Sequence, residues 1–258
     1  MSSNKIASDK TVDACLVIIG NEILSGRTQD ANLAYIAKGL GEVGVRLKEV
    51  RVIPDVAETI IATINELRAK FAYVFTTGGI GPTHDDITSE SLARAFGVPW
   101  VLDPEAKRRL EAGYRPGELN AARLRMAHVP EGATLIDNPV SRAPGFQIGN
   151  VLVLAGVPKV MQAMFDGIKH RLVGGAPVLS RSVTCALPEG IIAESLGQLQ
   201  QCYAELDIGS YPFYRRGGNG VALVIRGTDA ARIAAAVAEL MDLIRALGGD
   251  PVEGDPPQ

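Results

Sequence analysis

Short apolar runs and helical apolar stripes alternate along the first part of the chain. Apolar runs at residues 14–19 and 72–77 are typical of buried strands, and residues 45–53 are predicted to form a strand between them. Between them, apolar residues recur every three or four positions, which is typical of amphipathic helices. The two stripes are Leu33, Ile36, Ala37, Leu40 and Val43, then Ile60, Ile61, Ile64 and Leu67. This β-α-β-α-β order predicts right-handed crossovers and a mostly parallel sheet, the α/β class.

Polar residues and glycines predict where these first two helices begin and end. Asp30 precedes the first stripe, and its side chain could accept hydrogen bonds at a helix N-terminus. Gly44 follows that stripe and predicts its end. Asp55 and Glu58 have the spacing of a capping box, which predicts the start of the second helix.

The rest of the first domain is predicted from shorter patterns. A helix follows Asp86 and stops at residues 97–99, and residues 104–127 are helical in two pieces broken at 115–117. We expect a strand at 134–136 and a hairpin over 147–155 that turns at Gly149 and Asn150. A helix over 158–172 then closes a three-layer domain spanning residues 12–174.

A second, smaller domain is predicted at residues 178–248. A Gly-Gly-Ala-Pro linker at 174–177 precedes it, and its pattern reads strand, helix, strand, strand, helix. This order predicts a small α+β domain. Its elements are expected at 180–187, 191–206, 208–214, 221–226 and 229–247, with a turn at 217–220. The last helix is rich in alanine and needs a covering sheet or a partner.

Composition narrows the class of protein. The chain has 258 residues, 47% of them hydrophobic, and a net charge of −3, which argues against a nucleic-acid partner. No apolar segment reaches the roughly 20 residues that span a bilayer, so we expect no membrane partner. Residues 1–11 are polar, lack a signal-peptide pattern and are predicted to be disordered, as is the Gly-, Pro- and acid-rich tail 249–258. Three scattered cysteines fit a reducing cytoplasm.

The candidate site lies in residues 72–91, which predict a strand, a glycine loop, two acids and a helix. Gly78, Gly79 and Gly81 allow a ligand to approach the backbone, and Asp85 and Asp86 follow them. In an open α/β sheet such a junction lies at the carboxyl ends of the strands, where ligands bind. Loop amides attract phosphate, whereas two carboxylates repel it; a divalent cation such as Mg²⁺ resolves that conflict. The loop matches neither the dinucleotide fingerprint nor the P-loop.

Further polar residues could complete this site. If the strands at 14 and 72 are neighbours, Glu22 and Asp30 come close to the acidic pair. Asn138 and Ser141 could contact a ligand from a later loop, although Asn-Pro is first a turn signal. The amide donors for a pyrophosphate are Thr77, Gly78, Gly79, Gly81 and Thr83.

Residues 78–88, with the sequence GGIGPTHDDIT, resemble the signature loop of the MoaB/MogA molybdopterin-binding superfamily, in the form found in its CinA branch. Residues 20–26 and the segments 138–139, 143–146 and 156–158 are similar to two further conserved blocks of the family. The sequence GSYP at 209–212 resembles a segment of the small second domain of CinA proteins. Ala155 and Val160 depart from the family, which usually has Pro and Glu there. The chain ends too soon for the amidase domain of many CinA proteins, so we expect a stand-alone form.

The resemblance implies roles for several residues. Asp86 matches both the MoaB/MogA and the CinA patterns and is the leading candidate for catalysis and metal binding, with Asp85 beside it. Thr88 and Glu90 match the same pattern, Thr88 as a ligand-binding residue and Glu90 as a metal ligand. Glu90 could equally serve only to stabilise the helix dipole.

Three functions remain open at this point. The CinA likeness implies a metal-dependent pyrophosphatase acting on a nucleotide diphosphate such as ADP-ribose or FAD. The superfamily also suggests molybdopterin as a ligand, with pterin binding or adenylylation in molybdenum cofactor synthesis. The departure at Val160 favours a third reading, a nucleotide- or pterin-binding module without catalysis. The family further suggests a homo-oligomer.

Overall fold

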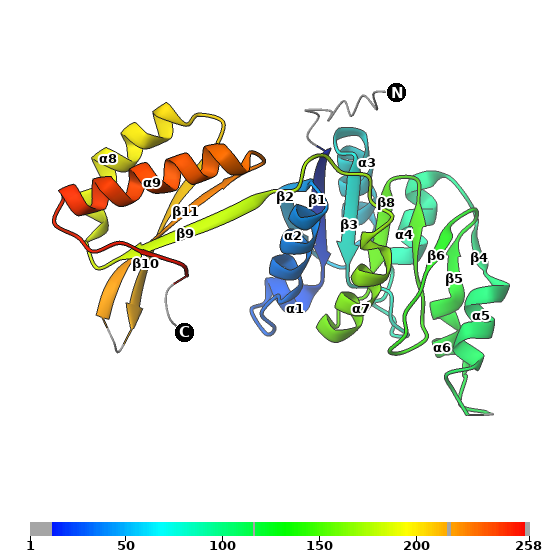
Figure 1. The fold of residues 1–258 in the computed structure, drawn as a ribbon. Helices are drawn as coiled ribbons and strands as arrows, with labels where there is room; N and C mark the ends of the chain where they lie inside the picture. The colour runs from blue at the N-terminus through cyan, green and yellow to red at the C-terminus, as the bar shows by residue number, and fades with distance from the viewer. Residues whose placement is uncertain (1–11, 116, 216–217, 256–258) are drawn as a thin grey trace, which may run out of the picture. The chain divides into compact units, whose positions relative to one another are not determined.

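The computed structural model describes residues 12–115, 117–215 and 218–255 (Figure 1). The chain divides into two compact units, with the boundary between Gly175 and Ala176. This boundary falls inside the predicted linker. The predicted disorder of residues 1–11 concerns residues that lie outside the described part of the chain.

The first unit is built on a six-stranded sheet with the order β2-β1-β3-β8-β7-β6. The first four strands are parallel, and β7 and β6 extend the sheet in antiparallel pairing. The mostly parallel sheet is therefore confirmed, and so is the predicted hairpin, as β7 and β8. The strands are β1 (Val12–Ile19), β2 (Val45–Ile53), β3 (Tyr73–Thr77), β6 (Thr134–Ile136), β7 (Gly145–Ile148) and β8 (Val151–Leu154).

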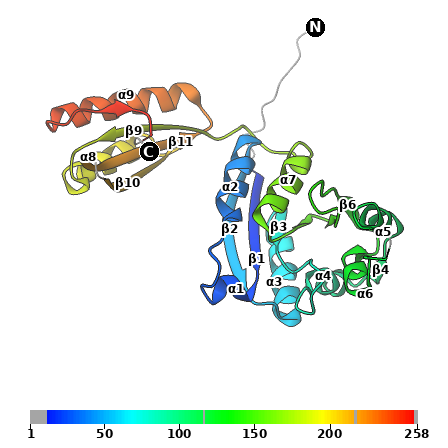
Figure 2. The same cartoon turned by 90° about the horizontal axis from the view of Figure 1, so that it is seen from below.

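Two helices cover each face of this sheet, so the predicted three layers are confirmed (Figures 1 and 2). Helices α2 (Asn32–Glu42) and α7 (Pro158–Lys169) pack on one face. Helices α3 (Ala57–Lys70) and α4 (Thr88–Phe96) pack on the other. Successive side chains of β1 lie on opposite faces of the sheet. Cys15, Val17 and Ile19 pack on the α3 side, whereas Leu16 and Ile18 pack on the α2 side.

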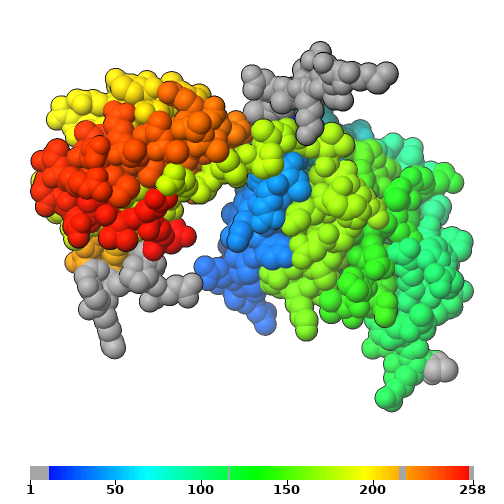
Figure 3. Space-filling view, in the orientation of Figure 1, coloured from blue at the N-terminus to red at the C-terminus, as the bar shows by residue number. Residues whose placement is uncertain are grey.

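Helices α2 and α7 lie side by side, as the blue and yellow-green atoms of Figure 3 show. Their contact centres on the buried ring of Phe165, which packs edge-on against Tyr35 and Phe75. Gly39 leaves room for this ring, because a Cβ at that position would lie 2.4 Å from it. This contact packs α7, whose first turn forms part of the site, against α2.

An excursion between α4 and β6 carries a small two-stranded sheet. Strands β4 (Trp100–Leu102) and β5 (His128–Pro130) pair antiparallel, and the sequence analysis missed both because three residues give no readable alternation. Between them lie the helices α5 (Pro104–Glu111) and α6 (Ala121–Leu124) and a 3₁₀ turn, η1 (Arg125–Ala127). The predicted helix in two pieces therefore exists but is shorter. Its break includes residue 116, which lies outside the described residues.

The second unit is an antiparallel sheet with the order β10-β11-β9-β12, and helices α8 and α9 share a core with it. The predicted order of strand, helix, strand, strand, helix is confirmed. The alanine-rich helix α9 buries Ile233, Val237 and Leu240 in that core, so the sheet covers it. The turn expected at 217–220 is wrong for residues 218–220, which belong to β11, and residue 217 lies outside the described residues. The elements are β9 (Leu179–Cys185), α8 (Glu189–Cys202), β10 (Asp207–Arg215), β11 (Gly218–Gly227), α9 (Ala230–Ala246) and β12 (Val252–Glu253).

The predicted disorder of the tail 249–258 is wrong for its described residues. Val252 and Glu253 form β12, which pairs with β9. Pro251 is buried, the Gly254 N–H donates to the Ser182 carbonyl, and Arg181 forms an ion pair with Glu253. Composition alone suggested disorder, but the open edge of β9 supplies backbone partners that composition cannot reveal. Residues 256–258 lie outside the described part. Among the described helices, none is long and apolar enough to span a membrane.

Candidate functional site

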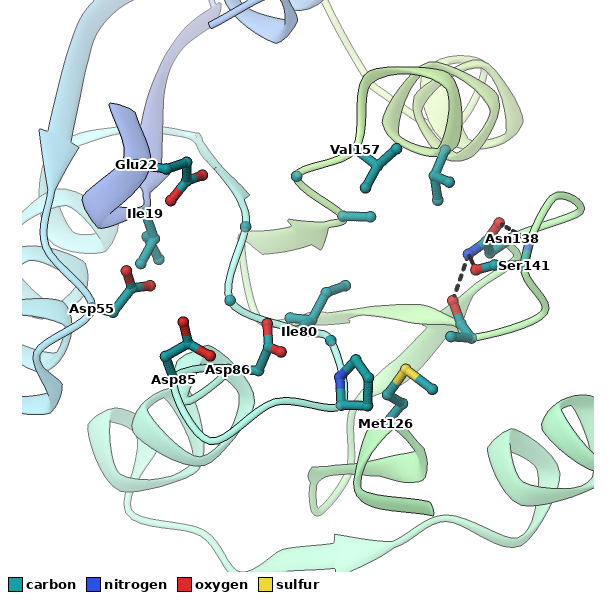
Figure 4. Close-up of a pocket in the computed structure, with 18 of the residues that line it drawn as sticks. Ile19, Glu22, Asp55, Ile80, Asp85, Asp86, Met126, Asn138, Ser141 and Val157 are labelled. Atoms are coloured by element: carbon teal, nitrogen blue, oxygen red, sulfur yellow. Dashed lines mark hydrogen bonds between the residues drawn. The ribbon is translucent and has the colours of Figure 1, made fainter. Parts of the chain in front are cut away.

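A cavity of about 460 Å³ lies at the carboxyl ends of β1, β3 and β8 (Figure 4). Ile19 ends β1, Gly78 follows β3, and Gly156 follows β8, and all three line the cavity. Its volume falls in the range of roughly 300–1,000 Å³ that is usual for small-molecule sites. The sequence placed the site at this edge of the sheet.

The glycine loop after β3 is fixed by close backbone contacts. Gly78 has a φ of 100°, and a Cβ there would lie 2.1 Å from the Ile19 carbonyl oxygen. Gly79 has a φ of 67°, and its Cβ would lie 2.1 Å from Thr88 Oγ1. Glycine is therefore required at both positions.

Thr88 holds this loop in place from the start of α4. Its hydroxyl donates to the Gly78 carbonyl at 3.1 Å, and its N–H donates to the Gly79 carbonyl at 3.0 Å. The side chain is fully buried and does not line the cavity. Thr88 was expected to bind ligand directly, whereas the structure gives it a positioning role.

The acidic pair is organised by one hydroxyl group. Thr83 Oγ1 lies 2.6 Å from both Asp85 Oδ1 and Asp86 Oδ2, and the Thr83 N–H donates to Asp86 Oδ2 at 2.8 Å. The hydroxyl hydrogen bond lowers the pKa of Asp85, with a smaller contribution from the backbone. A hydroxyl has a single hydrogen to donate, so it cannot satisfy both carboxylates at once. A cation at this point would relieve their repulsion.

Glu22 and Asp55 bring two more carboxylates to the same end of the cavity. Asp55 accepts a hydrogen bond from the Asn21 N–H at 2.9 Å and does not cap α3, so the predicted capping box is wrong. Burial raises the pKa of Asp55, and the negative charges of Glu22 and Asp85 raise it further. Asp55 was missed as a site residue. Its position directly after β2, beside β1 in the sheet, was the available signal.

The charged side chains in the described lining at this end of the cavity are all negative. Its lining includes four carboxylates and no lysine, arginine or histidine among the described residues. In the part of the chain that the structure describes, no three Asp, Glu, His or Cys side chains are grouped closely enough to hold a metal by themselves. Magnesium is commonly held by one or two carboxylates together with water and substrate phosphates. The donor set therefore fits a cation that arrives with a phosphorylated ligand.

Some backbone N–H groups of the loop donate to protein acceptors, and others are free to donate to a ligand. The Gly78 N–H donates to the Leu154 carbonyl, and the Thr83 N–H is committed to Asp86. The N–H groups of Gly79 and Gly81, both in the cavity lining, have no partner among the described residues. Thr77 is buried at the end of β3 and does not line the cavity. Two of the five predicted donors are thus free for a ligand.

Two predicted acids lie away from the cavity. Asp30 accepts the N–H groups of Asn32 and Leu33 at 3.2 and 2.8 Å, so it stabilises the start of α2 as predicted but does not reach the ligand. Glu90 is exposed in the first turn of α4 and does not line the cavity. Neighbouring strands bring Glu22 to the site but not Asp30, because the helix start engages the Asp30 side chain.

Asn138 and Ser141 do line the cavity, at the end opposite Glu22 and Asp55 (Figure 4). The Asn138 amide donates to Ser141 Oγ at 2.6 Å and to the Ala143 carbonyl at 2.8 Å. Its oxygen accepts the N–H groups of Val140 and Ser141. Asn138 is therefore fully used in shaping its own loop, and Ser141 is the residue of this pair with a hydrogen left to donate.

The remaining walls are apolar and were missed by the sequence analysis. They come from five separate segments of the chain, so no single local motif predicts them. The residues are Ile80, Pro82, Tyr114, Met126, Ala143, Ala155, Val157 and Val160. Val160, noted as a departure from the family pattern, lies at this apolar end of the cavity.

Comparison with known proteins finds a family match for each unit. The family described as "Probable molybdopterin binding domain" matches residues 15–174, and the "FAD synthase, middle domain" family matches residues 177–248. Because the first match covers more than half of the chain, the chain belongs to this molybdopterin-binding-domain family.

Relatives and a solved structure agree with this assignment. A protein of Archaeoglobus fulgidus is 33% identical over 230 residues, 89% of this chain and 96% of the relative. A CinA-like protein of Desulfosudis oleivorans is 34% identical over 194 residues, 70% of this chain and 47% of that protein. The crystal structure of CinA from Thermoplasma acidophilum, described as having unknown function, is 33% identical, with a TM-score of 0.59 over 62% of this chain and 98% of that one. The expected CinA-like branch of the MoaB/MogA fold is thus confirmed, and the chain spans less than half of that CinA-like protein.

Proposed function

We propose that this protein hydrolyses the diphosphate bond of a nucleotide such as ADP-ribose or FAD with the help of a divalent cation. The observation that carries the proposal is the acidic end of the cavity, whose described lining holds four carboxylates and no lysine, arginine or histidine beside a glycine loop with free amides. His84, which is outside this lining, lies 4.0 Å from Asp85. A bare diphosphate would be repelled there, whereas a diphosphate carrying Mg²⁺ would be attracted.

Asp85 and Asp86 are the residues that would hold the cation, with Glu22 and Asp55 adding negative charge around it. When bound, the cation supplies charge neutralisation and polarises a phosphoryl oxygen. The free N–H groups of Gly79 and Gly81 would donate to the non-bridging phosphate oxygens and orient the diphosphate. Glu90, away from the cavity, is not included in this ligand set.

The chemical step is a balanced hydrolysis. The oxygen of a water molecule attacks one phosphorus, a new P–O bond forms, and the bond from that phosphorus to the bridging oxygen breaks. The bridging oxygen leaves with the second phosphate, and a carboxylate accepts the proton of the water. We assign that proton transfer to Asp86, whose Oδ2 is fixed by Thr83 and whose side chain faces the cavity (Figure 4). ADP-ribose would give AMP and ribose 5-phosphate, and FAD would give AMP and FMN.

The match of the second unit supports the choice of substrates. Residues 177–248 resemble the middle domain of FAD synthase, a protein named for a nucleotide diphosphate product. That likeness favours FAD as one substrate to test beside ADP-ribose.

The test is a cleavage assay with the purified full chain. ADP-ribose and FAD are incubated separately with Mg²⁺, with Mn²⁺, and with a chelator, and AMP is measured by chromatography. The proposal predicts AMP only in the metal-containing reactions. Absence of AMP under all conditions, with the protein shown to be folded, would contradict it.

A second function is favoured by the family match of the first unit. That family is described as a "Probable molybdopterin binding domain", and a pterin would need a ring pocket together with a phosphate site. If molybdopterin raises the melting temperature while neither nucleotide is cleaved, the site serves pterin binding or adenylylation. If ADP-ribose or FAD raises it without turnover, the protein is a binding module.

A further inference from the structure

The cavity has two ends of opposite chemical character. Glu22 and Asp55 lie at one end, and Figure 4 shows Asn138, Ser141 and Val157 at the other. No charged side chain belongs to that second end among the described lining residues. A ligand that fills the cavity must therefore carry its charge at one end only.

The walls of the uncharged end face each other across the cavity. Val157 and Val160 at the start of α7 form one side, and Met126 lies across from Val157 (Figure 4). Val160 is 9% exposed and is part of the core, whereas Val157 is 62% exposed at the cavity mouth. Apolar side chains on two sides of the cavity suit a planar ring, whose faces lose water on entry.

Few side-chain hydrogen-bonding groups are free at this end, and two hydroxyls, those of Ser141 and Tyr114, are the ones available in its described lining. The Asn138 side-chain amide already donates to Ser141 and Ala143 and accepts from Val140, so it is not free to bind a ligand. The Ser141 hydroxyl accepts from Asn138 and keeps one hydrogen to donate. A phosphate or a sugar would need several donors here, because buried polar groups without partners are costly. A heterocycle with an acceptor at its edge needs only one.

We propose that this uncharged end binds the planar heterocycle of the ligand between the Val157–Val160 wall and Met126, while the diphosphate lies at the acidic end. This inference rests on the proposed function, because it assumes a nucleotide. Val157 and Val160 are then specificity-determining residues. FAD carries a planar heterocycle in each half, and adenosine and riboflavin as separate probes distinguish the two.

The test measures binding of three probes to the full chain by calorimetry. Adenosine and riboflavin carry a ring and no phosphate, and methylenediphosphonate with Mg²⁺ carries the phosphate groups and no ring. Val157→Gln is the first variant, because its exposed side chain can change without disturbing the core. Val173→Gln is the matched control, since Val173 is 75% exposed and away from the cavity.

Val157→Gln should weaken binding of the preferred nucleoside about tenfold, the factor that corresponds to roughly 1.4 kcal/mol. Methylenediphosphonate binding should stay unchanged, and Val173→Gln should leave all three probes unchanged. Val160→Gln provides a second, more buried variant, which should have the larger effect.

Three results would overturn the inference: no nucleoside binding by the wild type, nucleoside binding unaffected by both cavity variants, or equal weakening of the diphosphonate. Failure of the proposed function is recognised separately, by absence of AMP in the cleavage assay. Weaker nucleoside binding by the variants together with absence of cleavage would support the ring site and contradict the proposed hydrolase activity.

Discussion

Gly78 determines how closely the loop after β3 approaches β1. A methyl group there would meet the Ile19 carbonyl oxygen at 2.1 Å, and the φ of 100° is unfavourable for any L side chain. We therefore predict that Gly78→Ala lowers the free energy of unfolding by about 2 kcal/mol or more, from strain plus the backbone clash. Urea unfolding monitored by circular dichroism measures this change.

Gly132 offers the matched control for that substitution. It has a φ of 80°, but no atom lies within 4 Å of the position a Cβ would take. Gly132→Ala should therefore cost only the strain of a positive φ, about 1 kcal/mol. Equal losses for the two variants would show that the contact with β1 is unimportant.

Asp55 should make stability depend on pH. Its pKa is raised above the usual 3.8, first by burial and then by nearby carboxylates, so the folded state favours its neutral form. The stability contributed by the neutral form is complete below pH 3.8 and is lost as pH rises through the folded pKa. Asp55→Asn stays neutral and can still accept the Asn21 N–H. The variant should match the wild type near pH 4 and melt at a higher temperature at pH 7. The gain in free energy of unfolding at pH 7 should be less than about 1 kcal/mol, because the group is partly solvated.

Thermal melts from pH 4 to pH 8 test this expectation. A constant difference in melting temperature across that range would contradict a role for ionised Asp55. The same substitution should reduce cleavage, because it removes one of the four negative charges that attract the cation at the acidic end.

Cys15 tests burial and pKa together. Desolvation raises the pKa of this thiol to about 12, so almost none of it is the reactive thiolate at pH 8. Cys202 is exposed, whereas Cys15 and Cys185 are buried. Iodoacetamide followed by mass spectrometry should label Cys202 in the folded protein, and the other two only after denaturation. Labelling of Cys15 in the folded protein at a similar rate would contradict this packing.

The sequence predicted site residues where chemistry and spacing are local. The loop glycines and Asp85 and Asp86 lie within nine residues of one another, and the structure places them at one cavity. Asp55 and the apolar walls were missed because several separate segments supply them. Asp30 and Glu90 were predicted to belong to the site but do not line the cavity. In a sequence, a carboxylate that binds a ligand near a helix start cannot be distinguished from one that only stabilises the helix.

At the scale of elements, strand β12 should stabilise the second unit. Removing residues 250–258 would delete its pairing with β9, the burial of Pro251 and the Arg181–Glu253 ion pair. The exposed edge of β9 should then exchange its amide hydrogens faster. Hydrogen exchange measured by mass spectrometry tests this, with removal of residues 256–258 as the matched control. Unchanged protection of β9 in the longer deletion would contradict the role of β12.

Long, periodic elements were predicted well, and short ones were not. Strands β1 and β3 have apolar runs, and helices α2 and α3 have apolar stripes, so each can be predicted from its own segment. Strands β4, β5 and β12 contain two or three residues each and exist because a partner strand is present. Their partners are distant in sequence, so the pattern of a single segment does not contain them.

At the scale of the whole molecule, every residue of the candidate cavity belongs to the first unit. Its lining extends from Ile19 to Val160, and each unit has its own hydrophobic core. We predict that a fragment of residues 1–175 folds and binds methylenediphosphonate with Mg²⁺ as tightly as the full chain. Calorimetry of both proteins measures this. A folded fragment with much weaker binding would show that the second unit contributes to the site.

The central claim is that the acidic end of the cavity performs metal-dependent diphosphate cleavage, and Asp86 tests it most directly. AMP release from ADP-ribose and from FAD should be compared for the wild type, Asp86→Asn and Glu90→Gln, with Mg²⁺ and with a chelator. Glu90→Gln is the matched control, because it removes an exposed carboxylate from the same segment without touching the cavity. The account predicts that Asp86→Asn loses about 100-fold or more of the metal-dependent rate, the typical contribution of a positioned acid or base, while Glu90→Gln keeps it. Equal activity of Asp86→Asn and the wild type, or cleavage that persists in the chelator, would contradict the account.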